Sequence, residues 1–99
     1  MTGFTAEIIK IISSVPEGKV ISYGRAAALA GNPKGARQVA RILHSMSGKY
    51  NLPWHRVVNS RGRISLPEGG GREEQIYLLM QEGVKVSLDG EICLEKYGM

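Results

Sequence analysis

The chain has 99 residues, 42% of them hydrophobic and 22% charged, and it carries a formal net charge of +4 at pH 7. This length predicts a single domain with one hydrophobic core over residues 1–99, and the absence of an apolar run of roughly 18 residues excludes a membrane-spanning helix. The N-terminal residues lack the pattern of a secretory signal, and one cysteine with two histidines excludes an internal disulfide and a cysteine-rich metal site, so an intracellular protein without metal or cofactor is expected.

The first two predicted elements are helices. Apolar residues recur at helical spacing over residues 4–15, with Thr5 as the expected N-cap and Pro16 as the residue that blocks continuation. After a Pro-Glu-Gly turn and a short extended segment, Ser22 is expected to cap a second helix through YGRAAALAG. Tyr23 therefore lies at the start of the second helix.

A third helix is predicted directly after the second. Asn32 followed by Pro33 predicts an N-cap with proline at the first helical position, opening a helix through ARQVARILHSM. Its apolar stripe consists of Val39, Ile42, Leu43 and Met46. Its basic stripe consists of Lys34, Arg37, Arg41 and His44. Two helices joined by a tight turn, the second with a basic face, match the helix-turn-helix pattern that docks on DNA.

The second half of the chain predicts shorter elements. Residues 52–58, LPWHRVV, predict a loop entering a short strand, and residues 59–63 predict a turn. The glycine-rich residues 66–74 lack the Gly-Lys-Ser/Thr ending of a phosphate-binding loop. They are therefore expected to form a flexible loop at the rim of a site and not to bind phosphate. A last helix over residues 76–83 and a hairpin over residues 84–94 complete a fold that is α+β and mostly helical.

Positive charge is concentrated in one stretch of the chain. Between Gly18 and Pro67 there are nine Lys and Arg residues and no Asp or Glu, whereas the remainder has four basic and nine acidic residues. An acid-free stretch of this length suits a polyanion, because neutralising phosphates releases counterions and drives binding regardless of sequence. Nucleic acid is therefore the favoured partner, and a basic domain of unrelated function is the alternative.

The only tryptophan, Trp54, stands between Pro53 and His55. The proline fixes its own φ and restrains the residue before it, so a stiff loop presents the indole. Packing in the core and lining a site both fit this placement, and a buried, satisfied imidazole is the simpler interpretation of His55. No acidic residue at local spacing supports a nucleophile-histidine-acid arrangement, and Cys93 is far in sequence from the other candidates.

Three segments of the chain resemble one family of proteins. SYGRAAALAGNPKGARQVARILHS, LPWHRVVNSRG and LLMQEG are similar to the DNA-binding domain of O6-alkylguanine-DNA alkyltransferases, and the similarity runs from about Phe4 to Val86. The resemblance implies a winged-helix-like helix-turn-helix fold. In those enzymes a cysteine between the proline and the histidine accepts the alkyl group, and this position is Trp54 here. Because an indole has no ionisable nucleophile, the chain is not expected to be an enzyme.

The sequence Pro-Trp-His-Arg is the mark of the alkyltransferase-like proteins, which bind alkylated guanine without repairing it. The resemblance therefore implies a protein that recognises O6-alkylguanine in double-stranded DNA by minor-groove docking and base flipping, and that flags it for nucleotide excision repair proteins. A stand-alone monomer is expected, cytoplasmic and nucleoid-associated in a bacterium or nuclear in a eukaryote.

The resemblance also implies roles for individual residues. Tyr23 is similar to the residue that rotates a phosphate and turns the damaged nucleotide out of the duplex. Arg37 is similar to the finger residue, which enters the minor groove and fills the gap left by the flipped base. The expected DNA contacts are Tyr23, Lys34, Ala36, Arg37, Arg41 and Ser60. The expected lining of the lesion pocket is Tyr23, Pro53, Trp54, His55, Val57 and Ser60. His55 and Glu82 are similar to a proton-relaying pair, whose role without a thiol is structural or electrostatic.

The chain departs from the family in more than the lost cysteine. Met46 stands where active enzymes place an asparagine that braces the site. At the pocket rim, Pro67 and Glu68 stand where the family supplies a Tyr-Ser pair and some alkyltransferase-like proteins an arginine. Arg63 or Arg72 is a candidate to stack over the modified base in place of these groups.

Two other functions stay open on the sequence alone. One is residual alkyl transfer with Cys93 as a displaced nucleophile. The other is an ordinary helix-turn-helix regulator that reads the major groove of unmodified DNA, in which Trp54 belongs to the core.

Overall fold

The computed structural model describes residues 2–99, in which short helices outnumber strands. The elements are α1 (Gly3–Ser13), β1 (Ile21–Ser22), α2 (Tyr23–Leu29), α3 (Ala36–Tyr50), the 3₁₀ turn η1 (Trp54–Arg56), β2 (Val57–Val58), α4 (Arg72–Gln81) and α5 (Leu94–Tyr97). The prediction of a mostly helical α+β fold is confirmed. Over these described residues, no helix is both long enough and apolar enough to cross a membrane.

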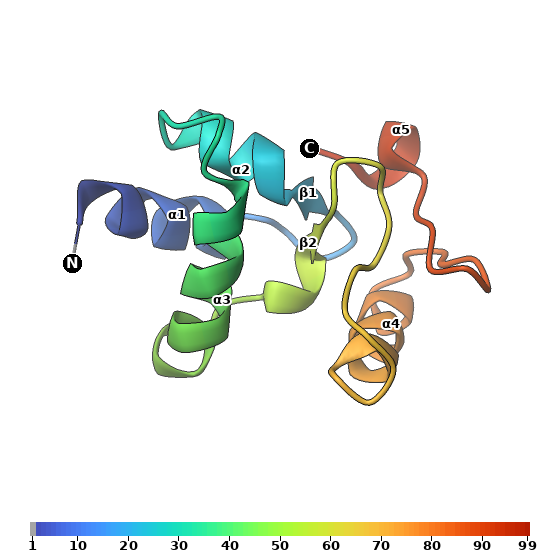
Figure 1. The fold of residues 1–99 in the computed structure, drawn as a ribbon. Coiled ribbons are helices and arrows are strands. Elements are labelled where there is room, and N and C mark those ends of the chain that lie inside the picture. Colours follow the sequence, from blue (N-terminus) through green and yellow to red (C-terminus); the bar gives the residue numbers. More distant parts are fainter. Residues whose placement is uncertain (1) are drawn as a thin grey trace.

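A two-stranded parallel sheet lies between two groups of helices (Figure 1). Ile21 of β1 pairs with Val57 of β2, and Ser22 pairs with Val58. Because neighbouring residues of a strand point to opposite faces, Ile21 and Val57 pack with α1, α2 and α3, whereas Val20 and Val58 pack with the C-terminal part of the chain. Length predicts one core, but the buried residues of the described chain form two clusters, one on each side of the sheet.

α2 and α3 form the predicted helix-turn-helix, and the structure corrects where α3 begins. Ser22 caps α2 as predicted. The predicted cap of the third helix, Asn32, lies in a turn instead, because its side-chain oxygen accepts from Lys34 N at 3.3 Å and its carbonyl oxygen accepts from Gly35 N at 2.9 Å. The helix therefore begins at Ala36, three residues later than the sequence predicts.

Gly35, the N-cap of α3, lies where the turn meets α1. A Cβ atom at this position would stand 2.9 Å from Phe4 Cζ and 3.1 Å from the carbonyl oxygen of Asn32, so a larger residue would require the Phe4 side chain or the turn to shift. The predicted apolar stripe is confirmed: Val39, Ile42 and Leu43 are buried and Met46 packs against them. This packing fixes the direction of α3 and turns its polar face outward.

The first helix begins earlier than the sequence predicts. Thr2, rather than Thr5, caps α1, since its side chain accepts from Thr5 N at 3.1 Å. The hydroxyl of Thr2 also donates to that of Thr5 at 2.9 Å, so the residue expected as the cap supports the actual one.

The predicted hairpin over residues 84–94 is wrong. A turn forms between Ser87 and Glu91, but the chain after it pairs with an earlier segment, and Ile92 N donates to Gly62 O at 2.8 Å. A short helix, α5, then follows that was not predicted. Pairing between segments this far apart leaves no periodic signal in the sequence of either one.

Candidate nucleic-acid interface

A cavity of about 410 Å³ opens beside α3, the start of α2 and the loop that leads into α4. Its lining residues are Tyr23, Ala40, Leu43, His44, Ser47, Trp54, Leu66, Gly70, Gly71 and Glu74. Sites for small organic groups usually measure roughly 300–1,000 Å³ and combine apolar walls with a few polar groups. Of the residues predicted for the lesion pocket, Tyr23 and Trp54 meet at this cavity.

Trp54 is held by the local geometry of the LPWHR segment. Pro53 has φ −77° and ψ 67°, the conformation of an inverse γ-turn, and Trp54 N donates to Leu52 O at 2.8 Å. The 3₁₀ turn then sends two neighbouring rings in different directions: the planes of Trp54 and His55 stand at 87°, with centroids 6.1 Å apart. Trp54 packs against the cluster of α1, α2 and α3 and also lines the cavity, so it has both of the roles that its placement allowed.

Gln75, on α4, fixes the backbone of this segment. Its side chain is buried, and Nε2 donates to His55 O and to Val57 O, both at 3.0 Å. Both amide hydrogens are therefore used on the two carbonyl groups that flank the end of η1. No sequence pattern singles out Gln75, which ties α4 to the turn that carries Trp54.

Glu82, just after α4, gathers three donors on one carboxylate. Its Oε2 lies 2.7 Å from both His55 Nε2 and Arg56 Nη2, and its Oε1 accepts from Gly18 N at 3.1 Å. Burial raises the pKa of this carboxyl, but hydrogen bonds from Arg56, His55 and Gly18 outweigh burial and lower the pKa to about 2. The contact between His55 and Glu82 that the resemblance implies is present, and Arg56, a partner not foreseen, extends it to Val15 O at 2.8 Å.

Four residues predicted for the lesion pocket do not line this cavity. Val57 is 1% exposed and belongs to the core, and Ser60 lies in the exposed turn after β2. Pro53 and His55 line a separate depression of about 580 Å³, which Trp54 divides from the cavity. The prediction placed sequence neighbours on one wall, but successive side chains of η1 and β2 point in different directions, so only Trp54 reaches it.

Neither arginine considered for stacking over a base lines the cavity. Arg72 Nη1 donates to Ile64 O at 3.2 Å, and its guanidinium packs so closely on Gly90 that a Cβ atom there would stand 2.5 Å from Nη2. Arg63 Nε lies 3.6 Å from Glu91 Oε1 in an exposed ion pair. Neither guanidinium group therefore lies at the cavity in this structure, and stacking of either one over a base stays a prediction.

Three polar residues of the cavity were not predicted to line it. They are His44, Ser47 and Glu74. His44 and Ser47 lie on the same face of α3 as Ala40, which also lines the cavity, so helical spacing could have identified these two. Ser47 Oγ is buried and has no hydrogen-bond partner among the described residues. Glu74 lies in the first turn of α4, and no sequence pattern relates it to Trp54.

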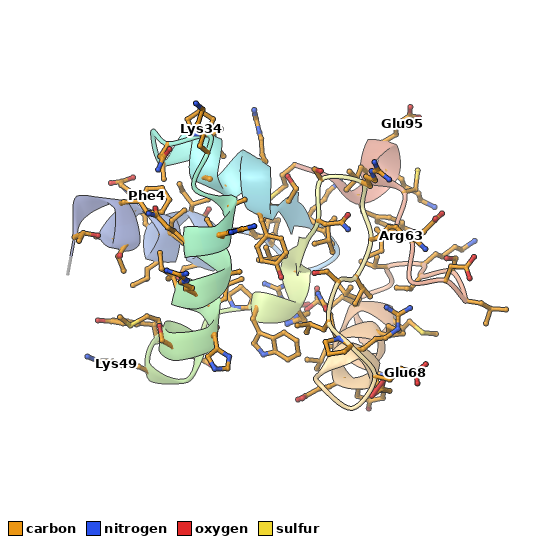
Figure 2. The ribbon with its side chains drawn as sticks, viewed as in Figure 1. Phe4, Lys34, Lys49, Arg63, Glu68 and Glu95 are labelled. Carbon is orange, nitrogen blue, oxygen red and sulfur yellow. The ribbon has the colours of Figure 1, made fainter. Side chains whose placement is uncertain are left out.

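The N-terminal half of α3 presents cations to solvent. Arg37 and Arg41 are exposed on the helix, and Ala36 at its start is half-buried. Lys34 is exposed in the turn before the helix (Figure 2). In the described part of the chain, no carboxylate oxygen lies within 4.0 Å of these three cations. They are therefore available to neutralise phosphate charges next to the cavity.

The order of these elements, with Tyr23 and Trp54 at one cavity, has a counterpart among known proteins. The model of the family "6-O-methylguanine DNA methyltransferase, DNA binding domain" matches residues 3–84. The chain belongs to this family. The DNA base-flipping protein of Escherichia coli is 45% identical over 94 residues, which cover 95% of this chain and 72% of that protein. Alkyltransferase-like protein 1 of Schizosaccharomyces pombe is 37% identical over 87 residues, which cover 87% of this chain and 81% of that protein.

Solved structures of family members share the fold. The crystal structure of Schizosaccharomyces pombe Atl1 in complex with damaged DNA containing O6-carboxymethylguanine matches with a TM-score of 0.89 at 33% identity, over 100% of this chain and 96% of that chain. Mycobacterium tuberculosis OGT in complex with DNA matches with a TM-score of 0.68 at 28% identity, over 84% of this chain and 50% of that chain. The recognition of an alkyltransferase-like protein, made from three sequence segments, is confirmed.

Cys93 of this alkyltransferase-like protein lies outside the cavity. It is exposed, precedes α5 as its N-cap, and is absent from the cavity lining. Its neighbour in sequence, Ile92, is buried, whereas Cys93 is exposed. The residue that reaches the cavity from the LPWHR segment is Trp54.

Proposed function

We propose that this alkyltransferase-like protein binds O6-alkylguanine in double-stranded DNA and leaves the alkyl group in place. The observation that carries the proposal is the cavity lined by Trp54 and Tyr23 beside the cations of α3, with no thiol among its lining residues. A relative named a DNA base-flipping protein and the structure of Atl1 with damaged DNA support it. Alkyl transfer needs an activated nucleophile such as a thiolate, which an indole cannot supply.

Docking begins with phosphate contacts from α3 and the turn before it. Lys34, Arg37 and Arg41 neutralise phosphates, and Tyr23, at the start of α2, meets the backbone of the damaged nucleotide where the cavity opens. Rotating a nucleotide out of the stack costs a few kcal/mol, and least for a damaged base that pairs weakly. Arg37 enters from the minor groove and fills the gap that the flipped base leaves.

The flipped base is then held in the cavity. Trp54 offers an aromatic face, and Leu43 and Leu66 bury the alkyl group, which stabilises the complex by about 0.8 kcal/mol for each CH₂ removed from water. Ser47 Oγ, which has no partner among the described residues, donates to or accepts from the base. The complex with its extruded base marks the lesion, and nucleotide excision repair proteins are the partners we expect to recognise it.

The proposal is tested with two duplexes that differ in one guanine. We expect fluorescence anisotropy at fixed salt to give an affinity about ten-fold higher, or about 1.4 kcal/mol, for the duplex with one O6-methylguanine. The intact mass of the protein should not change after incubation. Equal affinity for both duplexes would favour a regulator of unmodified DNA, whereas a mass gain of one methyl group that is lost in Cys93→Ser would favour alkyl transfer to Cys93.

Ser47→Ala is expected to change stability and lesion binding in opposite directions. Removing a buried hydroxyl without a partner and adding a better helix former should raise the free energy of unfolding by about 1 kcal/mol. Losing the hydrogen bond to the base should weaken lesion binding roughly three-fold. Denaturant titration and anisotropy measure the two effects, and unchanged lesion affinity would remove Ser47 from the binding site. Ser45→Ala is the matched control, because Ser45 Oγ is exposed and donates to Arg41 O at 3.0 Å.

A further inference from the structure

Glu74 gives the wall of the cavity a negative charge. Three residues of the lining are ionisable, Tyr23, His44 and Glu74, and of these the carboxyl group is the one that is ordinarily charged at pH 7. In the part of the chain that the structure describes, no Lys, Arg or His nitrogen lies within 4.0 Å of the Glu74 carboxylate. A substituent on a bound guanine therefore meets an uncompensated negative charge.

Positive groups near Glu74 do not cancel this charge. Arg72, one helical turn or less away, directs its guanidinium to Ile64 O and is not part of the lining. The N-terminus of α4 carries about half a positive charge, but Glu73 and Glu74 both lie in the first turn, so this end of the helix is net negative. Glu73 Oε1 accepts from Gly69 N at 2.8 Å within the loop, which leaves Glu74 as the carboxylate at the cavity.

We propose that Glu74 selects the bound lesion by charge, so that the cavity accepts neutral or cationic O6 substituents and disfavours anionic ones. The inference rests on the proposed function, since it concerns the same cavity. A carboxylate on the substituent would share the cavity with the Glu74 carboxylate, and like charges at short range repel even where water reaches them. A methyl group carries no charge and is not affected, and an ammonium group is attracted.

This selectivity would distinguish the chain from a family member of known structure. Atl1 of Schizosaccharomyces pombe was crystallised with DNA containing O6-carboxymethylguanine, whose substituent ends in a carboxylate. The cavity described here would bind that lesion less tightly than O6-methylguanine, although the two folds match with a TM-score of 0.89. The charge of a single side chain at the start of α4 would then set which lesion this cavity prefers.

The test compares duplexes of one sequence that carry O6-methylguanine, O6-carboxymethylguanine or O6-(2-aminoethyl)guanine. Affinities for the three duplexes are measured at one fixed pH and one fixed salt concentration. The wild-type protein should bind the carboxymethyl duplex roughly five-fold more weakly than the methyl duplex. Glu74→Gln should bring this ratio to within about two-fold, and Glu74→Lys should reverse the order of the charged lesions. Circular dichroism confirms that each variant is folded, as expected for exchanges at an exposed helical position.

The matched control is Glu95→Gln, which removes one negative charge far from the cavity. Figure 2 shows Glu95 on α5 at the top of the view, whereas Glu68, in the loop that leads into α4, lies near the bottom. The control should leave the ratio of affinities unchanged. Equal wild-type binding of the methyl and carboxymethyl duplexes, or an unchanged ratio in Glu74→Gln, would overturn the charge selectivity while leaving lesion binding intact. No preference for any lesion duplex over the guanine duplex would overturn the proposed function and this inference with it.

Discussion

Glu82→Gln is expected to lower the free energy of unfolding by about 3 kcal/mol at pH 7. The carboxylate joins three parts of the chain: the turn at Gly18, the η1 segment with His55 and Arg56, and the end of α4. Its side chain is 11% exposed and that of Arg56 is 14% exposed, so water compensates little for a lost partner. A neutral amide leaves the Arg56 guanidinium without a counter-charge. Denaturant unfolding followed by circular dichroism measures the difference.

The effect of Glu82→Gln should depend on pH in a defined direction. The pKa of Glu82 is lowered in the folded protein from 4.5 to about 2, so the charged carboxylate stabilises the fold above about pH 4.5 and this stabilisation is lost as the pH falls towards 2. The difference between wild type and variant should therefore fall to less than half of its pH 7 value at pH 3. A difference that stays constant from pH 7 to pH 3 would show that the charge is not what stabilises the network.

Glu91→Gln is the matched control for this exchange. Glu91 also pairs with an arginine, but its Oε1 lies 3.6 Å from Arg63 Nε and the two side chains are 59% and 46% exposed. An exposed ion pair contributes between zero and about 1 kcal/mol, so the variant should lose no more than about 0.5 kcal/mol at pH 7. Similar losses of stability in Glu82→Gln and Glu91→Gln would contradict the conclusion that burial makes the ion pair of Glu82 the stronger one.

Arg37→Ala is expected to weaken binding of a lesion duplex roughly thirty-fold, or about 2 kcal/mol. Arg37 is exposed near the start of α3, and no carboxylate holds it among the described residues. If it fills the gap left by a flipped base, its loss raises the cost of flipping in addition to removing one phosphate-attracting charge. Binding to the intact duplex should weaken less than about five-fold, since that complex does not need the gap filled.

The variant Arg41→Ala tests whether Arg37 acts by filling the gap left by the flipped base or only by its positive charge. Arg41 lies one turn further along α3, is also exposed, and does not line the cavity. Its loss should weaken binding to both duplexes by a similar factor and reduce the slope of log affinity against log salt by about 1. Equal effects of Arg37→Ala and Arg41→Ala on the preference for the lesion duplex would contradict the finger role of Arg37.

The N-terminal helices α1, α2 and α3 could be predicted because each buries apolar residues that its own sequence displays. Val39, Ile42 and Leu43 recur at helical spacing and are buried, and Ser22 caps α2 as its position indicates. The start of α3 was misplaced because Asn32 forms a local turn as readily as it caps a helix. Local chemistry left these two outcomes open, and in the structure Gly35, packed close to Phe4, is the N-cap.

The candidate site was only partly predictable, because it is assembled from segments that meet across the fold. Trp54 and Tyr23 were found through motifs that each lie within one segment. Gln75 and Glu74 come from α4, and their relation to the LPWHR segment depends on where that helix packs. His55 was predicted for the pocket but turns to Glu82 instead, since the 3₁₀ turn separates it from Trp54.

The central claim is that a damaged guanine enters the cavity lined by Trp54, and the emission of this single tryptophan tests it most directly. The protein is titrated at fixed salt with matched duplexes, with and without one O6-methylguanine. We predict that the lesion duplex binds more tightly and changes the emission of Trp54 beyond what the intact duplex does, because a base stacked near the indole alters its surroundings. Identical affinity and identical emission changes for the two duplexes would contradict the account and favour a protein that binds DNA without regard to damage.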